Sequence, residues 1–155
     1  MTASPRAVEL ALIAAQAAAD KLAKDITVLD VSDRLALTDC FVLASADNER
    51  QVKAVVDEVE EKLRLIGVKP LRREGEREGR WVLLDFVEIV VHVQRVEERE
   101  FYDLERLWKD CPQIEFVDRD AAARTAVPVG GGSEPGVGSA AGGVLGDPSG
   151  RAGSW

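Results

Sequence analysis

The sequence has few residues from which a metal centre or a disulfide framework could be built. Its 155 residues include only two cysteines and one histidine. Cys40 and Cys111 lack the close spacing and the companion histidines of a zinc site, and two cysteines are too few for a disulfide-stabilised secreted fold. We therefore expect two reduced thiols, no metal and no cofactor.

Long apolar runs and targeting signals are also missing. No run approaches the roughly 20 apolar residues that a membrane-spanning helix needs. The N-terminus has neither the apolar block and cleavage site of a signal peptide nor the basic character of a transit peptide. The sequence therefore predicts a cytoplasmic protein that does not contact a membrane.

Basic residues are outnumbered, with 20 Lys and Arg against 28 Asp and Glu and a formal net charge of −8. Such a chain lacks the cationic surface that neutralises phosphates, which argues against DNA binding. For the same reason RNA is expected to provide at most a minor contact at the edge of a binding site. Opposite charges steer protein association, so a basic protein is the expected partner.

Helical and strand patterns alternate through the first three quarters of the chain. Apolar spacing and capping residues predict three helices, over about 5–23, from a cap at Asp47 to Gly67, and over 97–108. Short apolar or β-branched runs predict strands at 26–31 and 40–46, an edge strand at 70–73, and a hairpin within 80–94. The alternation predicts an α/β fold, in which helices pack on a mixed β-sheet.

Residues 118–155 differ in composition from the rest of the chain. This segment is rich in Gly, Ala, Ser and Pro and has few large apolar side chains. It cannot bury enough surface to offset the entropy lost on ordering. We therefore expect an α/β domain over 1–117 and a disordered tail over 118–155.

The segment "RWVLLDFVEIVVHVQ", residues 80–94, consists of two apolar runs separated by Val87 and Glu88. In a hairpin that turns at these two residues, opposing side chains lie on the same face, and the faces alternate along each strand. Three apolar pairs then share one face: Val82 with Val93, Leu84 with Val91, and Phe86 with Ile89. This face is predicted to lie against the core.

The opposite face of the hairpin has a mixed character, because it pairs Trp81 with Gln94, Leu83 with His92, and Asp85 with Val90. If a helix covers this face, Trp81 and His92 are ordinary, partly buried residues. If the face is open, Trp81 and Leu83 anchor a partner, since tryptophan is enriched at interface hot spots. Asp85 and Gln94 would then form a polar rim. The open interpretation is favoured for Trp81 and the covered one for His92.

Five segments resemble, in the same order and at similar spacing, those of the ribosomal silencing factor family, also called Iojap proteins. They are "TDCFVLAS", "ERQVKAVVDEVEEKL", "EGEREGRWVLLDF", "VVHV" and "EEREFYDLERLW". The similarity extends from about Ala7 to Trp108. At the hairpin turn the family usually has glycine followed by an acidic residue, whereas this chain has Val87 and Glu88. A β-branched residue resists the positive φ that such turns often require.

The resemblance implies a bacterial translation repressor. Members of the family bind a basic protein of the large ribosomal subunit, the fourteenth in the standard list, near the subunit interface. They prevent the small subunit from joining when nutrients are short. The resemblance also implies a homodimer whose topology is related to that of nucleotidyltransferases. The partner-binding residues it implies are Trp81, Leu83, Asp85, Glu76 and Tyr102, and His92, which lies opposite Leu83, completes the candidate set.

The implied topology leaves a metal-dependent nucleotidyltransferase as the alternative function. Such an enzyme needs two closely spaced carboxylates and a Gly-Ser turn that holds phosphate. Asp85 is the only carboxylate on its face of the hairpin, and the loop "LASADNERQ" contains no glycine. The sequence therefore favours a protein without catalytic residues that acts by binding and obstruction.

Overall fold

The computed structural model describes residues 2–122. The predicted tail lies outside the described residues except for Asp118–Ala122. No helix in the described part is long and apolar enough to cross a membrane.

Six strands of the described chain form one mixed sheet, in the order β3-β4-β5-β2-β1-β6. The strands are β1 (Lys24–Asp30), β2 (Cys40–Ala46), β3 (Arg72–Glu74), β4 (Trp81–Asp85), β5 (Ile89–Arg95) and β6 (Gln113–Ile114). The central pair, β2 and β5, is parallel, and every other neighbouring pair is antiparallel. The predicted α/β fold with a mixed sheet is confirmed. Its nucleotidyltransferase-like topology stays an expectation of the resemblance.

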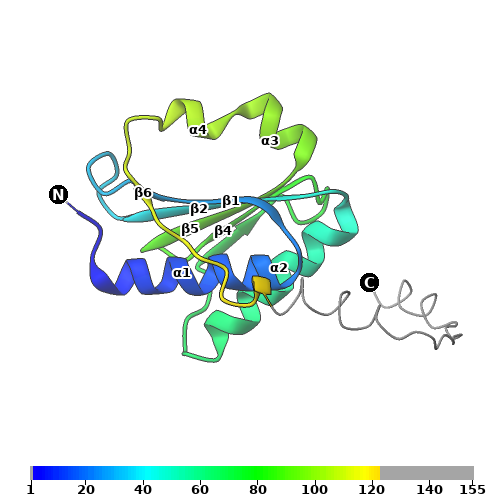
Figure 1. Cartoon of the computed structure of the whole chain (residues 1–155), viewed down its shortest axis with the longest axis horizontal. Helices are drawn as coiled ribbons and strands as arrows, with labels where there is room; N and C mark the ends of the chain where they lie inside the picture. Colours follow the sequence, from blue (N-terminus) through cyan, green and yellow to red (C-terminus); the bar gives the residue numbers. More distant parts are fainter. Residues whose placement is uncertain (1, 123–155) are drawn as a thin grey trace, which may run out of the picture. The chain divides into compact units, whose positions relative to one another are not determined.

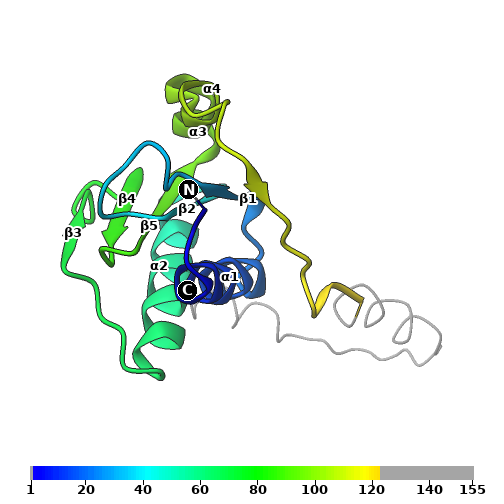
Figure 2. The ribbon, with the colours of Figure 1, turned by 90° about the vertical axis from the view of Figure 1, so that its left-hand side faces the viewer.

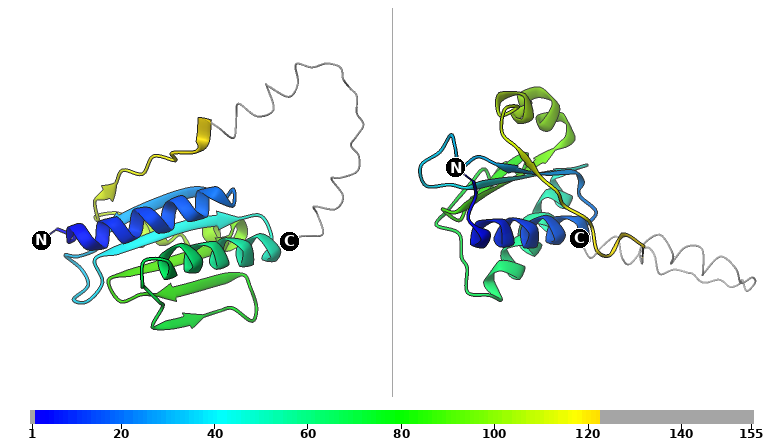
Figure 3. Two further views of the ribbon diagram at one scale, coloured as in Figure 1. Left: turned by 90° about the horizontal axis from the view of Figure 1, so that it is seen from below. Right: turned by 60° about the vertical axis from the view of Figure 1, so that its left-hand side comes forward.

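The helices lie on both faces of the sheet (Figures 1 and 2). One face carries α1 (Pro5–Asp20) and α2 (Glu49–Arg64), which run side by side (Figure 3). The other face carries the short helices α3 (Val96–Tyr102) and α4 (Leu104–Leu107). The sheet is therefore the middle layer of three, and its central strands are buried on both sides.

The first two helices begin at side chains that cap their free backbone N–H groups. Ser4 Oγ accepts a hydrogen bond from Ala7 N at 3.0 Å, and Pro5 occupies the first helical position. The predicted cap of α2 at Asp47 is wrong, because Asn48 Oδ1 accepts from Gln51 N at 2.8 Å. The Asp47 carboxylate instead pairs with the Lys24 ammonium.

The larger core lies between the sheet and the pair α1–α2. Alanines on α1 allow the helix to lie close to its neighbours, and the valines of α2 fill the remaining space. The six apolar residues of the hairpin face this core, each at most 6% exposed. The predicted register is confirmed, since β4 and β5 pair Trp81 with Gln94, Leu83 with His92, and Asp85 with Val90.

The structure corrects several predicted boundaries. The helix predicted over 97–108 is two helices, because Asp103 adopts a left-handed conformation with φ 47° and ends α3. The first helix ends at Asp20 rather than 23, because the chain turns into β1 through Leu22, with φ 66°. The edge strand is Arg72–Glu74, which starts two residues and ends one residue later than predicted. β6 was not predicted, since a strand of two residues leaves no pattern in the sequence.

The turn between β4 and β5 places a β-branched residue in an unfavourable conformation. Val87 has φ 74°, and Glu88 N donates to Phe86 O at 2.9 Å across it, as in a γ-turn. The conformation is held by its surroundings: Asp85 Oδ1 accepts from Val87 N at 2.8 Å, and Thr38 Oγ1 donates to Val87 O at 2.9 Å. The turn therefore stores backbone strain.

Replacing Val87 with glycine should stabilise the protein. Glycine adopts positive φ without strain, so the substitution removes a backbone strain of about 1–3 kcal/mol. The greater freedom of glycine in the unfolded chain destabilises the folded protein by about 0.4–1 kcal/mol, which offsets part of this gain. We expect Val87→Gly to raise the free energy of unfolding by about 1 kcal/mol in urea titrations. The control is Val117→Gly, at an exposed valine without positive φ, which should gain nothing. A loss of stability in Val87→Gly would contradict the assignment of strain.

Candidate functional site

A chain of aromatic rings crosses the sheet on the side of α3 and α4. We call these residues the aromatic row: Phe101, Tyr102, Trp81, His92, Phe41 and Trp108. Successive ring centroids lie 4.9, 4.8, 6.0, 4.9 and 4.9 Å apart. Phe101 is 80% and Tyr102 48% exposed, whereas His92 and Phe41 are buried. The row therefore leads from the molecular surface into the smaller core.

His92 links the two halves of the aromatic row. Trp81 Nε1 donates to His92 Nδ1 at 3.2 Å, so the histidine proton is on Nε2. Burial, together with the nearby Arg99 guanidinium, lowers the pKa of His92 to about 4. The imidazole is therefore neutral at physiological pH, where it positions the Trp81 indole.

The mixed face of the hairpin is partly covered. α3 lies against β5 and β2, and Trp81 and Leu83 on β4 are half-buried. Leu83 packs on the smaller core, together with Leu104 and Trp108. The sequence left open whether this face is covered by a helix or exposed. His92 is 6% exposed, so it fits the covered interpretation. Trp81 fits neither interpretation fully, because its half-buried ring contacts both buried His92 and exposed Tyr102.

The position of Gln94 corrects a prediction. The sequence placed it on a polar rim, but its side chain is fully buried, because α3 covers this part of β5. Asp85 lies at the opposite end of the face and is engaged. Its carboxylate pairs with Arg72 Nη2 at 3.1 Å and accepts the hydrogen bond from Val87 N. Asp85 therefore contributes to the turn whether or not a partner binds.

Glu76 lies apart from the other candidate residues. It lines a groove of about 260 Å³ with residues of α2, on the side of the sheet that Val82 faces. Gly75 fixes the start of this loop, since a Cβ there would come within 2.0 Å of Trp81 O. The structure thus brings together Trp81, Leu83, His92 and Tyr102, with Asp85 at one end, but not Glu76.

Two exposed apolar residues extend the candidate surface beyond the predicted set. Phe101 is 80% exposed near the end of α3, just before the break at Asp103. Leu107 is 64% exposed on α4. The alternation along the hairpin does not extend to these helices, so it identifies neither residue.

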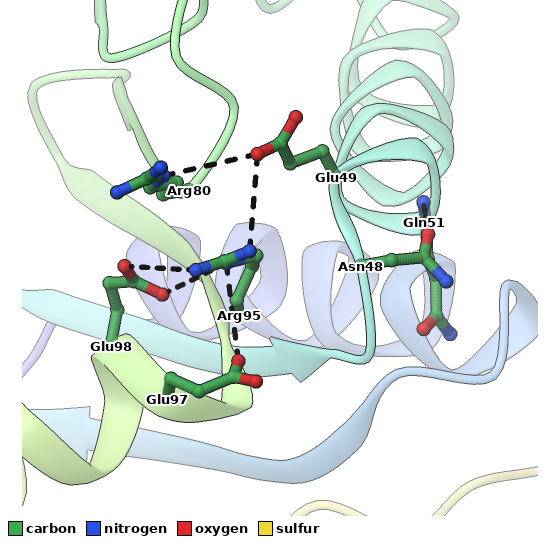
Figure 4. Close-up of polar contacts among 7 residues, drawn as sticks. All are labelled: Asn48, Glu49, Gln51, Arg80, Arg95, Glu97 and Glu98. Atoms are coloured by element: carbon green, nitrogen blue, oxygen red, sulfur yellow. Dashed lines mark hydrogen bonds and ion pairs between the residues drawn. The ribbon is translucent and has the colours of Figure 1, made fainter.

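An ion-pair cluster connects α2, α3 and the hairpin at the end of β5 (Figure 4). Arg95 Nε pairs with Glu98 Oε1 at 3.1 Å, and Arg95 Nη1 lies 3.9 Å from Glu49 Oε2. Arg80 Nε also lies 3.9 Å from Glu49 Oε2. The Arg95–Glu98 pair is partly buried, whereas the Arg80–Glu49 pair is exposed and, like other exposed pairs, contributes little to stability. The cluster therefore links the first turn of α3 to the first turn of α2 and to Arg80.

The two thiols are buried, and the acidic side chains of the described residues do not assemble into a metal-binding group. Cys40 and Cys111 are buried and unbridged. Burial, with the carboxylates of Asp30 and Asp39, raises the pKa of the Cys40 thiol to about 12. Within residues 2–122, no group of three His, Cys, Asp or Glu side chains could hold a metal ion.

Comparison with known proteins identifies the family. The sequence model described as "Ribosomal silencing factor during starvation" matches residues 4–130. The chain belongs to this family, RsfS. It is 36% identical over 108 residues to the ribosomal silencing factor RsfS of Halalkalibacterium halodurans, which covers 70% of this chain and 92% of the relative. It is also 39% identical over 100 residues to the ribosomal silencing factor RsfS of Bacillus subtilis, and this alignment covers 64% of this chain and 85% of the relative.

The fold is also that of solved structures. A crystal structure of a Chromobacterium violaceum protein superposes with a TM-score of 0.64 at 37% identity, covering 71% of this chain and 91% of that one. The RsfS match spans every helix and strand from α1 to β6. The predicted membership of the ribosomal silencing factor family is confirmed.

The pKa of His92 predicts how stability depends on pH. Below pH 6.5 the unfolded chain binds a proton at this histidine, whereas the folded chain does not until about pH 4. Stability is therefore complete above pH 6.5 and falls as the pH is lowered, by about 2 kcal/mol between pH 6.5 and 5. Urea titrations across this range measure the change. His92→Leu should flatten the dependence; an unchanged slope in this variant would contradict the assignment.

Proposed function

We propose that the protein is a translation repressor that binds a large-subunit protein of the ribosome at the subunit interface. The partner is a basic protein, the fourteenth in the standard list, and the bound repressor sterically blocks joining of the small subunit when nutrients are limiting. Membership of the RsfS family supports this function. The proposed binding site rests on one observation: the aromatic row ends in exposed rings on the surface of an acidic protein.

The chemistry of this surface suits protein binding. Phe101, Tyr102 and Leu107 expose large apolar side chains on neighbouring turns of α3 and α4. Half-buried Trp81 lies against Tyr102, with ring centroids 4.8 Å apart. Aromatic residues held by neighbouring rings lose little entropy on binding and are typical hot spots. Trp81, Tyr102 and Leu83 are proposed as the centre of the interface, with His92 supporting Trp81 from below.

Acidic side chains are present on the same helices as the exposed aromatic residues. Glu97 is 69% exposed on α3, and Glu100, Asp103 and Glu105 line an open hollow beside it. Glu88 at the turn and Glu76 in the separate loop add negative charge further away. Because Asp85 is engaged by Arg72, it is proposed to act mainly by holding the turn. The carboxylates are proposed to steer a basic partner and to fix its orientation.

Obstruction needs affinity and bulk but no reaction. The protein therefore requires no cofactor and no catalytic residue in the proposed mechanism. The family resemblance supports action in the cytoplasm and a homodimer; contact with ribosomal RNA would be confined to the edge of the interface, since the chain has a net charge of −8.

Truncating Trp81 should weaken binding without unfolding the protein. We expect Trp81→Ala to lose about tenfold or more in affinity for large ribosomal subunits, because hot-spot truncations cost more than about 1 kcal/mol. Co-sedimentation with separated subunits measures the loss, and Trp81→Phe, which keeps an aromatic ring, should lose less. The control is Leu65→Ala, which truncates a residue 64% exposed just beyond α2.

Each outcome of this experiment decides between functions. Binding to the large subunit, lost in Trp81→Ala but not in Leu65→Ala, together with fewer joined ribosomes, would support obstruction from this surface. Equal affinity of wild type and Trp81→Ala would refute the proposed anchor. Absence of binding to either subunit would refute the function and favour the nucleotidyltransferase alternative.

The charge of the protein predicts how association depends on salt. Steering by opposite charges is screened when the Debye length shortens, from about 30 Å at 0.01 M to about 8 Å at 0.15 M. We expect the association rate with the isolated ribosomal protein to fall about tenfold over this range, with little change in the dissociation rate. Surface plasmon resonance at several salt concentrations measures both rates. A salt-independent association rate would exclude a role for the acidic side chains in steering.

A further inference from the structure

Gly75 approaches the main chain of β4 more closely than a residue with a side chain can. β3 and β4 lie at one edge of the sheet (Figure 2), and their register pairs Glu74 with Leu83, so Gly75 follows beside the start of β4. A Cβ built on Gly75 would lie 2.0 Å from Trp81 O and 3.1 Å from Trp81 C. Nonbonded carbon atoms are optimally about 3.5–4.0 Å apart. Any side chain at this position would therefore displace the main chain of Gly75 or of Trp81.

The loop that contains Gly75 is anchored on both sides of this residue. Before it, Glu74 pairs with Leu83 in the sheet. After it, Gly79 N donates to Gly75 O at 3.0 Å, which closes the loop 75–79 into a turn. Gly75 itself has φ +84°, which glycine adopts without strain. The loop is therefore held close to the Trp81 carbonyl from both ends.

The peptide unit of Trp81 is enclosed from the opposite side by β5. The register of β4 and β5 pairs Trp81 with Gln94. Just before this pair, Arg95 N donates to Arg80 O at 2.9 Å. β4 lies between β3 and β5 in the sheet, so Trp81 cannot move away from Gly75 without disturbing its pairing with β5. A side chain at position 75 would accordingly turn the Trp81 peptide unit in place.

The position of the Trp81 indole depends on this peptide unit, because the side chain is attached to the same Cα. The indole N–H donates to His92 Nδ1 at 3.2 Å, and the ring lies against Tyr102 with centroids 4.8 Å apart. A hydrogen bond of this length is easily lost, since a contact of about 3.6 Å no longer counts as one. A small shift of the main chain would therefore release the indole from His92 and change the surface that it forms with Tyr102.

We propose that Gly75 is a positioning residue of the binding surface. Its missing side chain lets the loop 75–79 hold the Trp81 peptide unit against β5, and this directs the indole toward Tyr102 and the partner. The role of Gly75 in binding rests on the proposed function, with its basic ribosomal protein. The hold of Gly75 on Trp81 stands independently of the partner.

Three glycines with positive φ provide a matched set of variants. Gly67, Gly75 and Gly79 have φ +84°, +84° and +71°, so alanine introduces similar backbone strain at each. A Cβ at Gly67 meets nothing within 4 Å. A Cβ at Gly79, in the same loop as Gly75, comes 3.5 Å from Glu49 Cβ, which is an ordinary contact. Among these three variants, Gly75→Ala is thus the one that forces a shift at Trp81.

Gly75→Ala should weaken binding without unfolding the protein. We expect it to bind large ribosomal subunits about tenfold more weakly in co-sedimentation, as a displaced hot-spot residue would. Gly67→Ala and Gly79→Ala should each lower Tm by about 4 °C, because of the strain at positive φ, and keep the wild-type affinity. All proteins are compared well below the lowest Tm, after circular dichroism has confirmed that each is folded.

The indole N–H of Trp81 reports its own position in NMR spectra. Its resonance is distinguished from those of the other two tryptophans by its loss in Trp81→Phe. We expect it to move upfield in Gly75→Ala, because the hydrogen bond to His92 Nδ1 lengthens, and to stay in place in Gly67→Ala and Gly79→Ala. This measurement needs no ribosomal partner.

The other outcomes contradict the proposal. An unmoved indole signal in Gly75→Ala would mean that the loop yields instead of Trp81, whatever the affinity. A moved signal with wild-type affinity would mean that the position of Trp81 does not matter for binding. An equal loss of affinity in all three variants would attribute it to backbone strain alone. If wild-type protein does not bind large subunits, the proposed function fails, and the indole signal then decides whether Gly75 positions Trp81.

A second variant covers the case in which Gly75→Ala does not fold. Insertion of two glycines between Arg77 and Glu78 adds no side chain, and surface loops tolerate longer lengths at little cost. The longer loop loses the hydrogen bond from Gly79 N to Gly75 O, so its hold on Trp81 weakens. We expect the indole signal to move upfield and the affinity to fall in this variant as well. An unmoved signal would overturn the proposal.

Discussion

The register between β4 and β5 is the constraint on which the rest of the structure depends. Side chains alternate along a strand, so a shift of one residue would exchange the two faces. In the observed register, Val82, Leu84 and Phe86 enter the core under α1 and α2, and Trp81, Leu83 and Asp85 remain on the side of α3. The same pairing places His92 opposite Leu83, within reach of the Trp81 indole. The core and the candidate surface are thus two consequences of one alternation.

The sequence predicts this alternation well because it depends on local pairing and a single turn. The apolar face of the hairpin, the mixed sheet and the positions of most elements follow from spacing alone. The burial of Gln94 and the exposure of Phe101 do not. The burial of Gln94 depends on the tertiary packing of α3 on β5, and the exposed Phe101 lies just before the left-handed residue Asp103 that ends α3. The residue that caps α2 is likewise decided by a tertiary contact. Asp47 pairs with Lys24, and Asn48 is the cap.

The structure places the residues of the predicted site in different surroundings. Trp81 and Tyr102 form an aromatic pair at the edge of the covered face. His92 and Asp85 hold this surface in place, one through the indole N–H and the other through the turn. Glu76 belongs to a different part of the surface. Pattern and resemblance group such residues together, whereas only contacts separate those that support a surface from those that form it.

The two thiols lie in different cores, Cys40 under α1 and α2 and Cys111 on the side of α3. Neither is accessible at the surface, and the thiolate of Cys40 is strongly disfavoured. Alkylating dyes attack thiolates that they can reach. A cysteine introduced on the surface would therefore be the preferred site of labelling in the otherwise native chain. Fluorescent probes can accordingly be attached without first removing the protein's own cysteines.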